Sequence, residues 1–224
     1  MRLRNIKKSY GENRVFDGLD LDIQEGKVTA ILGESGCGKT TLLQIICGFI
    51  DDYQGEVEFV NDTSSGISYI FQDDALIPWK TVYENLEYVL KNRKIKDLKK
   101  YIDGYLKMVK LSDYADRYPD VLSGGMKRRV GIARAFAFPS KYLLMDEPFE
   151  FLDLRTKTDI IKDFKRLQNM SKKTVLFITH DIDSALDLGD NIVVLGSKPT
   201  RLIREFKNND TKDKMKENLE KLFL

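Results

Sequence analysis

The stretch that decides the fold is Val28-Thr29-Ala30-Ile31-Leu32-Gly33-Glu34-Ser35-Gly36-Cys37-Gly38-Lys39-Thr40. Its apolar beginning, residues 28–32, is short and ends at a glycine, which predicts a buried strand. Residues 33–40 fit the pattern G-x-x-x-x-G-K-[ST] at every fixed position. Residues 40–48 carry apolar side chains at helical spacing and end at a glycine, which predicts a helix. This order of strand, glycine-rich loop and helix is typical of a loop that binds phosphate.

The chemistry of such a loop explains its residue types. Glycines let successive backbone N–H groups surround a phosphate without Cβ clashes, and the helix N-terminus adds partial positive charge. We expect Lys39 to reach the outer phosphates of a nucleotide and the Thr40 hydroxyl to bind Mg²⁺. A chance glycine-rich turn is the alternative, which the flanking strand and helix disfavour. The expected nucleotide-binding residues here are Gly33, Glu34, Ser35, Gly36, Cys37, Gly38, Lys39, Thr40 and Thr41.

A second motif is the acidic pair at the end of an apolar run. Residues 143–145 are Leu-Leu-Met, and Asp146 and Glu147 follow them. Neighbouring residues of an extended strand point in different directions, so one carboxylate can face a metal while the other faces the substrate. We expect Asp146 to contact Mg²⁺ and Glu147 to activate the attacking water.

A third motif, Leu122-Ser123-Gly124-Gly125-Met126, precedes a helix that we predict from about residue 127 to 138. Ser123 is a suitable N-cap, so a plain helix start is one interpretation. The two glycines also expose backbone N–H groups at a helix N-terminus, which favours a second anion-binding site. Two such sites in one chain suggest a phosphate that is held from both sides.

The remaining pattern predicts an α/β fold. Strand-like segments occur at residues 19–24, 55–60, 67–71, 142–145, 174–178 and 192–195. A turn-rich segment, residues 61–66, joins two of them, and residues 81–118 have helical periodicity. Strands that alternate with helices predict a parallel sheet with right-handed crossovers, here with an inserted helical lobe. Residues 211–224 form a further amphipathic helical pattern.

Composition excludes several classes of protein. The 224 residues carry 37 Lys and Arg against 35 Asp and Glu, and this net charge of +2 argues against a nucleic-acid partner. The longest apolar run, residues 45–50, is far shorter than the roughly 20 residues of a membrane-spanning helix. No apolar segment follows the charged start, so we expect no secretory signal and a cytoplasmic protein. The two cysteines have no metal-ligand spacing, and His180 is the single histidine.

The three motifs together resemble those of the ATP-binding subunit of an ABC transporter. Four further residues fit that family: Tyr10 resembles the aromatic residue that stacks on adenine, and Gln72 the glutamine after a core strand. Asp153 resembles the aspartate that follows the acidic pair, and His180 the histidine that contacts the γ-phosphate. The resemblance implies an α/β P-loop ABC ATPase fold with a parallel core sheet, an N-terminal antiparallel β region and an inserted helical lobe. It implies one domain, residues 1–224, with its core in residues 1–80 and 140–224 and its lobe in about 81–139.

The resemblance also implies how the residues act. Two subunits pair head to tail, so that Ser123, Gly124 and Gly125 contact the ATP bound by the other subunit. ATP binding closes this pair and hydrolysis opens it. The implied site comprises Glu147, His180, Gln72 and Lys39 as catalytic residues, Thr40, Gln72 and Asp146 as Mg²⁺ ligands, and Tyr10, the loop, the signature residues and Asp153 around the nucleotide. The pair is a homodimer or a pair with a related subunit.

Residues 77–86 are similar to a stretch in importer ATPases of the nitrate, sulfonate, taurine and thiamine-precursor group. The resemblance therefore implies an integral membrane permease as partner, an extracytoplasmic solute-binding protein as an indirect partner, and a position on the inner face of the membrane. Two departures from the family stand out. Met126 replaces the usual Gln, and the bulky pair Glu150-Phe151 replaces small residues before Leu152-Asp153, which disfavours the close packing of two subunits there.

Other classes of protein stay open on the sequence. A non-transport ABC ATPase, an exporter subunit and an inactive nucleotide-binding scaffold share these motifs, although Glu147 and His180 disfavour the scaffold. A GTPase would use the guanine motif [NT]-K-x-D, which residues 156–159 match literally. That segment has a helical pattern and does not follow a strand of its own, so we expect no guanine site.

Overall fold

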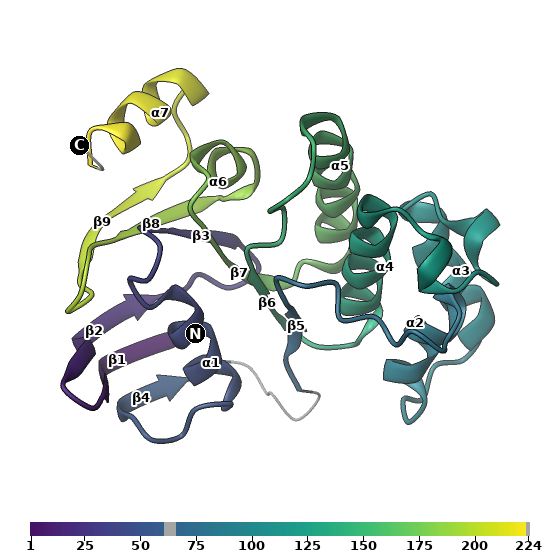
Figure 1. The fold of residues 1–224 in the computed structure, drawn as a ribbon, viewed down its shortest axis with the longest axis horizontal. Helices are drawn as coiled ribbons and strands as arrows, with labels where there is room; N and C mark the ends of the chain where they lie inside the picture. Colours follow the sequence, from purple (N-terminus) through teal and green to yellow (C-terminus); the bar gives the residue numbers. More distant parts are fainter. Residues whose placement is uncertain (61–65, 223–224) are drawn as a thin grey trace.

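The computed structural model describes residues 1–60 and 66–222 of the chain. Two sheets and a group of helices make up the fold (Figure 1). The larger sheet has six strands in the order β5-β6-β7-β3-β8-β9, and the smaller has three in the order β2-β1-β4. The predicted α/β fold, with a parallel core sheet, an N-terminal antiparallel sheet and a helical region, is therefore confirmed.

The larger sheet is parallel from β5 to β8. Its strands are β3 (Val28–Leu32), β5 (Ser68–Ile70), β6 (Tyr142–Asp146), β7 (Thr174–Thr179), β8 (Asn191–Leu195) and β9 (Leu202–Lys207). Every residue of β3, β6 and β7 is buried, because helices or the second sheet cover both faces. The sequence did not predict β9, an edge strand that runs antiparallel to β8 and whose side chains are mostly exposed.

The smaller sheet consists of β1 (Arg2–Tyr10), β2 (Asn13–Asp22) and β4 (Gln54–Glu58), and β1 pairs antiparallel with each of the other two strands. The predicted strand 19–24 coincides with β2 over residues 19–22 and extends two residues beyond its end. The sequence did not predict β1, because register shifts interrupt the alternation of apolar and polar residues along this strand. Asn5 has a φ of +50° at one of these shifts. The predicted strands 55–60 and 67–71 lie in different sheets, as β4 and β5, and residues 61–65 of the predicted turn lie outside the described residues.

The helical lobe lies beyond the β5 side of the larger sheet (Figure 1). It consists of α2 (Val82–Leu90), α3 (Leu98–Met108), the 3-10 turns Ser112–Tyr114 and Pro119–Val121, and α4 (Gly124–Ala137). Thr81 and Glu84 form a capping box that begins α2. α4 begins at Gly124 and not at residue 127, because Ser123 accepts a hydrogen bond from Met126 N and caps the helix there.

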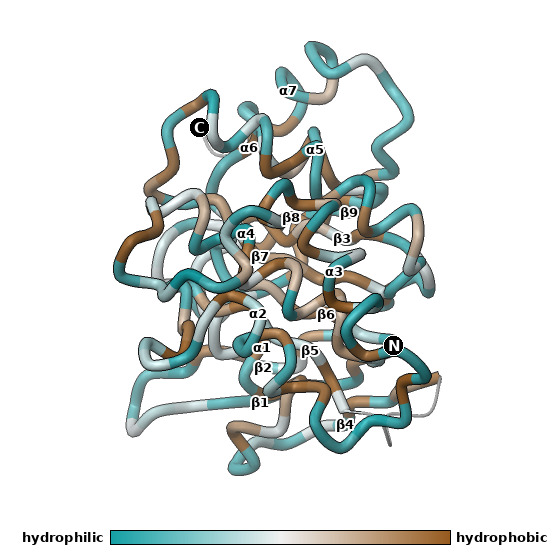
Figure 2. The backbone as a smooth tube through the Cα atoms, turned by 90° about the vertical axis from the view of Figure 1, so that its right-hand side faces the viewer, coloured by the Kyte–Doolittle hydropathy of each residue, from teal (hydrophilic) through white to brown (hydrophobic). Residues whose placement is uncertain are grey.

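Two apolar clusters hold the layers together. One lies between the larger sheet and the helices α2–α4, α5 (Leu154–Ser171), α6 (Ile182–Leu188) and α7 (Lys212–Glu220), and the other lies between that sheet, α1 (Lys39–Cys47) and the antiparallel sheet. Figure 2 shows the apolar stretches running along the interior strands. Helix α7 lies within the predicted helical segment 211–224, of which residues 223–224 lie outside the described residues.

The sequence Thr156-Lys157-Thr158-Asp159 lies inside α5 and not in a loop after a strand, so it has no guanine-site context. In the described residues, no helix combines the length and the apolar character needed to cross a bilayer.

A buried lysine supports the junction between α5 and β7. Lys173 Nζ donates hydrogen bonds to the backbone oxygens of Phe138 and Ser140 at 2.7 and 2.5 Å, and the residue is only 4% exposed. Burial lowers the pKa of Lys173 from its ordinary 10.5 to about 8. Between these two values the unfolded chain binds more protons than the folded chain, so rising pH stabilises the fold.

We therefore expect the free energy of unfolding of the wild type to rise, relative to Lys173→Met, by about 3 kcal/mol between pH 7.5 and 10.5. Urea unfolding at several pH values measures this difference. Lys165→Met, on the exposed face of α5, is the matched control and should follow the wild type. If the free energy of unfolding changed with pH in the same way for the wild type and Lys173→Met, the lowered pKa of Lys173 would be contradicted.

Candidate functional site

The glycine-rich loop, residues 33–40, joins β3 to α1 as the sequence predicted. Gly36 and Gly38 have φ values of +80° and +105°, which favour glycine. A Cβ on Gly38 would lie 2.5 Å from Val15 Cγ1, so β2 leaves no room for a side chain at this position. The loop is thereby held against the antiparallel sheet with its backbone close to the start of α1.

Lys39 begins α1 and its side chain folds back over the loop. Its ammonium group donates to the backbone oxygens of Gly33 at 2.7 Å and Glu34 at 3.0 Å. A lysine carries three N–H donors, so these two contacts leave one for a phosphate oxygen. Lys39 is 6% exposed, and an anion that reached it would be largely desolvated.

Thr40 and Asp146 approach each other across the ends of α1 and β6. Thr40 Oγ1 donates to Asp146 Oδ1 at 3.3 Å, and the Tyr69 hydroxyl donates to Asp146 Oδ2 at 3.4 Å. Burial raises the pKa of Asp146 above its ordinary value, and the hydrogen bond from Thr40 opposes this shift. Burial also raises the pKa of Tyr69, with the charge of Asp146 as a further cause, so its hydroxyl stays a donor.

Glu147 and His180 face each other because β6 and β7 are parallel neighbours, with Asp146 opposite Ile178. Glu147 follows β6 at φ +42°, a conformation that its N–H fixes by donating to Ile178 O at 3.1 Å. The carboxylate Oε1 of Glu147 lies 3.2 Å from His180 Nδ1. The acidic pair thus diverges: Asp146 points to Thr40, and Glu147 to the histidine.

Gln72 lies just beyond β5 and donates from Nε2 to Glu150 Oε2 at 2.5 Å. Its backbone is held by Arg128 of α4, whose Nη1 and Nη2 donate to the backbone oxygens of Phe71 at 2.8 Å and Gln72 at 2.5 Å. Burial lowers the pKa of Arg128, although a guanidinium remains charged at any physiological pH. Helix α4, which follows the Ser-Gly-Gly motif, is therefore hydrogen-bonded to the segment that carries Gln72.

Most of the predicted site residues line one cavity of about 360 Å³. Ten predicted residues line it: Tyr10, Ser35, Gly36, Gly38, Lys39, Thr40, Thr41, Gln72, Asp146 and Glu147. Val15, Glu150 and Lys198 line it too, although no motif in the sequence predicts them as site residues. Gly33, Glu34 and Cys37 belong to the loop without lining the cavity, and His180 lines an adjoining hollow that shares Glu147 and Glu150 with it.

The Ser-Gly-Gly motif does not line this cavity. Ser123 caps α4, and a Cβ on Gly125 would lie 2.4 Å from Thr156 Cγ2, so this glycine packs tightly on the first turn of α5. Asp153 caps α5 by accepting a hydrogen bond from Thr156 N at 3.0 Å. These residues form a second cluster at the N-termini of α4 and α5.

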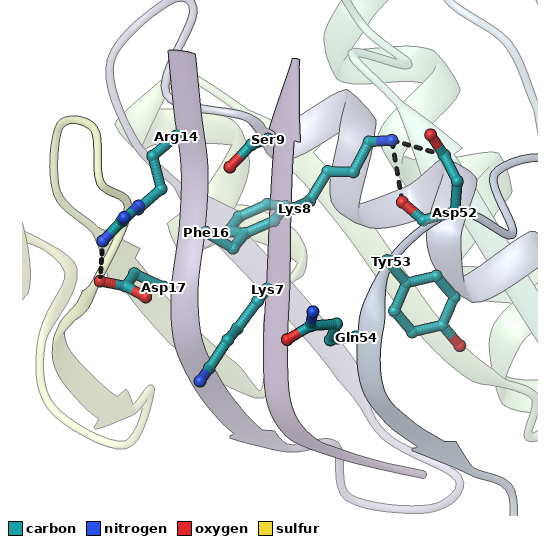
Figure 3. Close-up of a pocket in the computed structure, with 9 residues that line it drawn as sticks. All are labelled: Lys7, Lys8, Ser9, Arg14, Phe16, Asp17, Asp52, Tyr53 and Gln54. Atoms are coloured by element: carbon teal, nitrogen blue, oxygen red, sulfur yellow. Dashed lines mark hydrogen bonds and ion pairs between the residues drawn. The ribbon is translucent and has the colours of Figure 1, made fainter. Parts of the chain in front are cut away.

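A larger hollow of about 460 Å³ lies on the antiparallel sheet and contains none of the motif residues (Figure 3). The ammonium group of Lys8 is bound there by the carboxylate and the backbone oxygen of Asp52, as the dashed lines show. Lys8 Nζ also lies 4.5 Å from the ring centre of Tyr10. Lys8 therefore links this hollow to Tyr10, which lines the 360 Å³ cavity.

Sequence comparison identifies relatives with import functions. An Fe(3+) ions import ATP-binding protein, FbpC of Fusobacterium nucleatum, is 39% identical over 204 residues, which is 87% of this chain. The chain spans only 55% of the length of that relative. An aliphatic sulfonates import ATP-binding protein, SsuB of Bacillus thuringiensis, is 35% identical over 91% of this chain and 82% of its own length. A spermidine/putrescine import ATP-binding protein, PotA of Mannheimia succiniciproducens, is 39% identical over 87% of this chain and 55% of its own length.

Solved structures agree with this fold. CbiO1 of Clostridium perfringens, described as part of an ABC transporter complex, superimposes with a TM-score of 0.84 at 29% identity and covers 97% of this chain and 90% of its own. A dimeric ATP-binding cassette bound to ADP and Pi superimposes with a TM-score of 0.79 at 33% identity over 94% of this chain and 99% of its own. The sequence pattern of the ABC transporter family matches residues 16–150. This chain therefore belongs to the ABC transporter family, as an ATP-binding subunit that hydrolyses ATP.

Proposed function

We propose that this chain powers a membrane importer for a small solute, and that the 360 Å³ cavity is where it hydrolyses ATP. The observation that carries this proposal is the meeting of Lys39, Thr40, Asp146 and Glu147 around one cavity. A lysine and loop N–H groups bind phosphate, and a carboxylate beside them can act as general base.

In this proposal Glu147 accepts a proton from the water that attacks the γ-phosphorus. The bond from that phosphorus to the bridging oxygen breaks, and ADP and phosphate leave. His180, 3.2 Å from Glu147 Oε1, orients the carboxylate and approaches the γ-phosphate. Gln72 lies within the same cavity, and Tyr10 provides an exposed ring for the adenine to stack on.

The residues present fit Mg²⁺. Thr40 Oγ1 and Asp146 Oδ1 lie 3.3 Å apart, and both are oxygen ligands of the kind that Mg²⁺ prefers. Among the described residues no cluster of three acidic, cysteine or histidine side chains could hold a metal, which is consistent with an ion bound partly by substrate phosphates. Thr40, Asp146 and Gln72 would hold it, and the bound ion would neutralise charge on the phosphates.

The second cluster supplies the other half of the site in a head-to-tail pair. Ser123, Gly124 and Gly125 lie outside the cavity of their own chain, as expected for residues that contact the ATP of a partner subunit. The ATP would then bridge the loop of one subunit and the start of α4 in the other. Loss of the γ-phosphate removes that bridge, so hydrolysis opens the pair.

Exposed aromatic side chains flank the Gln72 segment and suit a permease as partner. Phe49 and Phe71 stack with ring centres 6.5 Å apart, and Trp79 is 77% exposed. The loop that carries Trp79 is fixed by the fully buried Asn85, which bonds to both backbone groups of Ile77. An ordered, exposed tryptophan is typical of an interface anchor. A permease bound here would sense the position of Gln72.

Replacing this anchor tests the permease surface. We expect Trp79→Ser to lower recovery of the permease with the tagged chain by about tenfold, while the isolated chain hydrolyses ATP as before. Quantitative mass spectrometry of detergent-solubilised complexes measures the recovery. Met170→Ser removes another exposed apolar side chain, near the end of α5, and should have no effect. Equal recovery for Trp79→Ser and the wild type would exclude this surface.

Within the importers we propose a sulfonate-like solute, in the group that also takes up nitrate, taurine and thiamine precursors. The sulfonate relative supports this choice because the match covers 82% of its length, against 55% for the iron and polyamine relatives. Deleting the gene from its host should abolish uptake of a labelled alkanesulfonate and leave Fe³⁺ and spermidine uptake intact. Loss of iron or polyamine uptake, with sulfonate uptake preserved, would replace this assignment.

A further inference from the structure

Lys198 is a cavity residue that belongs to none of the motifs. It lies in the turn between β8 and β9, is exposed, and lines the nucleotide cavity together with Tyr10 and Lys39. None of the ion pairs found between described residues involves Lys198. The cavity otherwise contains three carboxylates, those of Asp146, Glu147 and Glu150, and only one other lysine. A second cation there is available for an anionic ligand.

The turn that carries Lys198 is attached to the phosphate-binding loop. The buried Thr200 donates its hydroxyl to the backbone oxygen of Cys37, inside the loop, and its N–H to Val15 O at 2.7 Å. At the other end of the turn, a Cβ on Gly33 would lie 3.1 Å from Leu195 O, so the loop begins directly against the end of β8. The backbone of the turn at Lys198 is therefore held close to the loop, while the Lys198 side chain is exposed.

The attachment points also define which side of the cavity Lys198 occupies. Thr200 contacts Cys37 and Val15, and Val15 closes on Gly38. The groups assigned to the γ-phosphate, Glu147 and His180, come instead from the ends of β6 and β7. The turn thus approaches the nucleotide from the antiparallel-sheet side, where Tyr10 receives the base.

We infer that Lys198 is a nucleotide-binding residue, whose ammonium group contacts a phosphate that ATP and ADP share. This inference rests on the proposed nucleotide cavity and adds a second lysine to it. A contact with a shared phosphate contributes equally to ATP and ADP affinity. It therefore retains nucleotide without favouring either state of the hydrolytic cycle.

The test is a titration of the chain with Mg²⁺-bound ADP and with a non-hydrolysable ATP analogue. We expect Lys198→Ala to raise the Kd of both about fivefold and by the same factor, and Lys198→Arg to stay near the wild type. Because the contact is exposed, the factor should shrink between 50 and 500 mM KCl. Arg201→Ala removes a charge of the same turn that does not line the cavity, and it should bind both nucleotides normally.

Three outcomes would overturn the inference. Unchanged affinities for Lys198→Ala would show that the ammonium group makes no contact. A loss confined to the ATP analogue would place it at the γ-phosphate. An equal loss of nucleotide affinity in Arg201→Ala would show that the positive charge of the turn as a whole, and not a contact of Lys198, attracts the nucleotide. Lys39→Ala tests separately whether the cavity binds nucleotide at all. Wild-type nucleotide affinity in that variant would contradict the proposed nucleotide site, and not only the role of Lys198.

Discussion

Glu147→Gln is expected to lower the rate of ATP hydrolysis by a factor of about 10² to 10⁴, because an amide cannot accept the proton of the attacking water. The substitution keeps the size of the side chain and leaves the phosphate-binding loop intact, so ATP should bind as in the wild type. The backbone bond from Glu147 N to Ile178 O, which sets the position of the residue, does not depend on the side chain. Phosphate release and nucleotide titration measure the two quantities.

Glu56→Gln, an exposed carboxylate on β4, is the matched control and should hydrolyse ATP at the wild-type rate. Because Glu147→Gln stops the cycle with ATP bound, it should also form a dimer when ATP is added, visible as a doubled mass in light scattering. Wild-type turnover in Glu147→Gln would remove this residue from its assigned role.

Lys39→Ala is expected to weaken nucleotide binding about 10- to 100-fold, the usual value of a charge-assisted hydrogen bond in a desolvated site. The effect should exceed that of Lys198→Ala because Lys39 is buried and Lys198 is exposed. Titration with ADP measures the affinity without interference from turnover.

Lys39→Ala also removes two hydrogen bonds that stabilise the loop, to Gly33 O and Glu34 O. Thermal unfolding of the free protein therefore accompanies the titration, and Lys39→Arg restores a charge at the same position. Unchanged ADP affinity in a folded Lys39→Ala protein would refute the assignment of the loop.

The sequence predicts the parts of this fold that follow a local rule. The buried strand β3, the glycine-rich loop and the helix after it were found because apolar runs, glycines and helical spacing are local signals. Fully buried strands such as β6 and β7 are equally visible as apolar runs. The sequence also predicts the cap at Ser123, although the helix begins three residues before the predicted start at residue 127.

The rest depends on contacts between distant segments. β1 is interrupted by bulges, and β9 is an exposed edge strand, so neither has a clean alternation. Lys198 and Glu150 line the cavity because the turn after β8 and the segment after β6 both end beside the loop, and no spacing in the sequence states that. The Tyr69 hydroxyl that contacts Asp146 is likewise a product of the pairing of β5 with β6.

The bulky pair before Asp153, Glu150 and Phe151, takes two different positions in the folded chain. Phe151 is 88% exposed with φ +60°, and Glu150 turns inward to Gln72. A head-to-tail pair must accommodate this ring or use it as a contact.

The most direct test of the proposed importer is purification of the tagged chain from detergent-solubilised membranes of its own host. The chain should carry with it a polytopic membrane protein in stoichiometric amount, and Trp79→Ser should lose that protein while keeping its ATPase activity. A soluble partner in its place, with no membrane protein recovered in any variant, would contradict the importer and indicate a non-transport ABC ATPase.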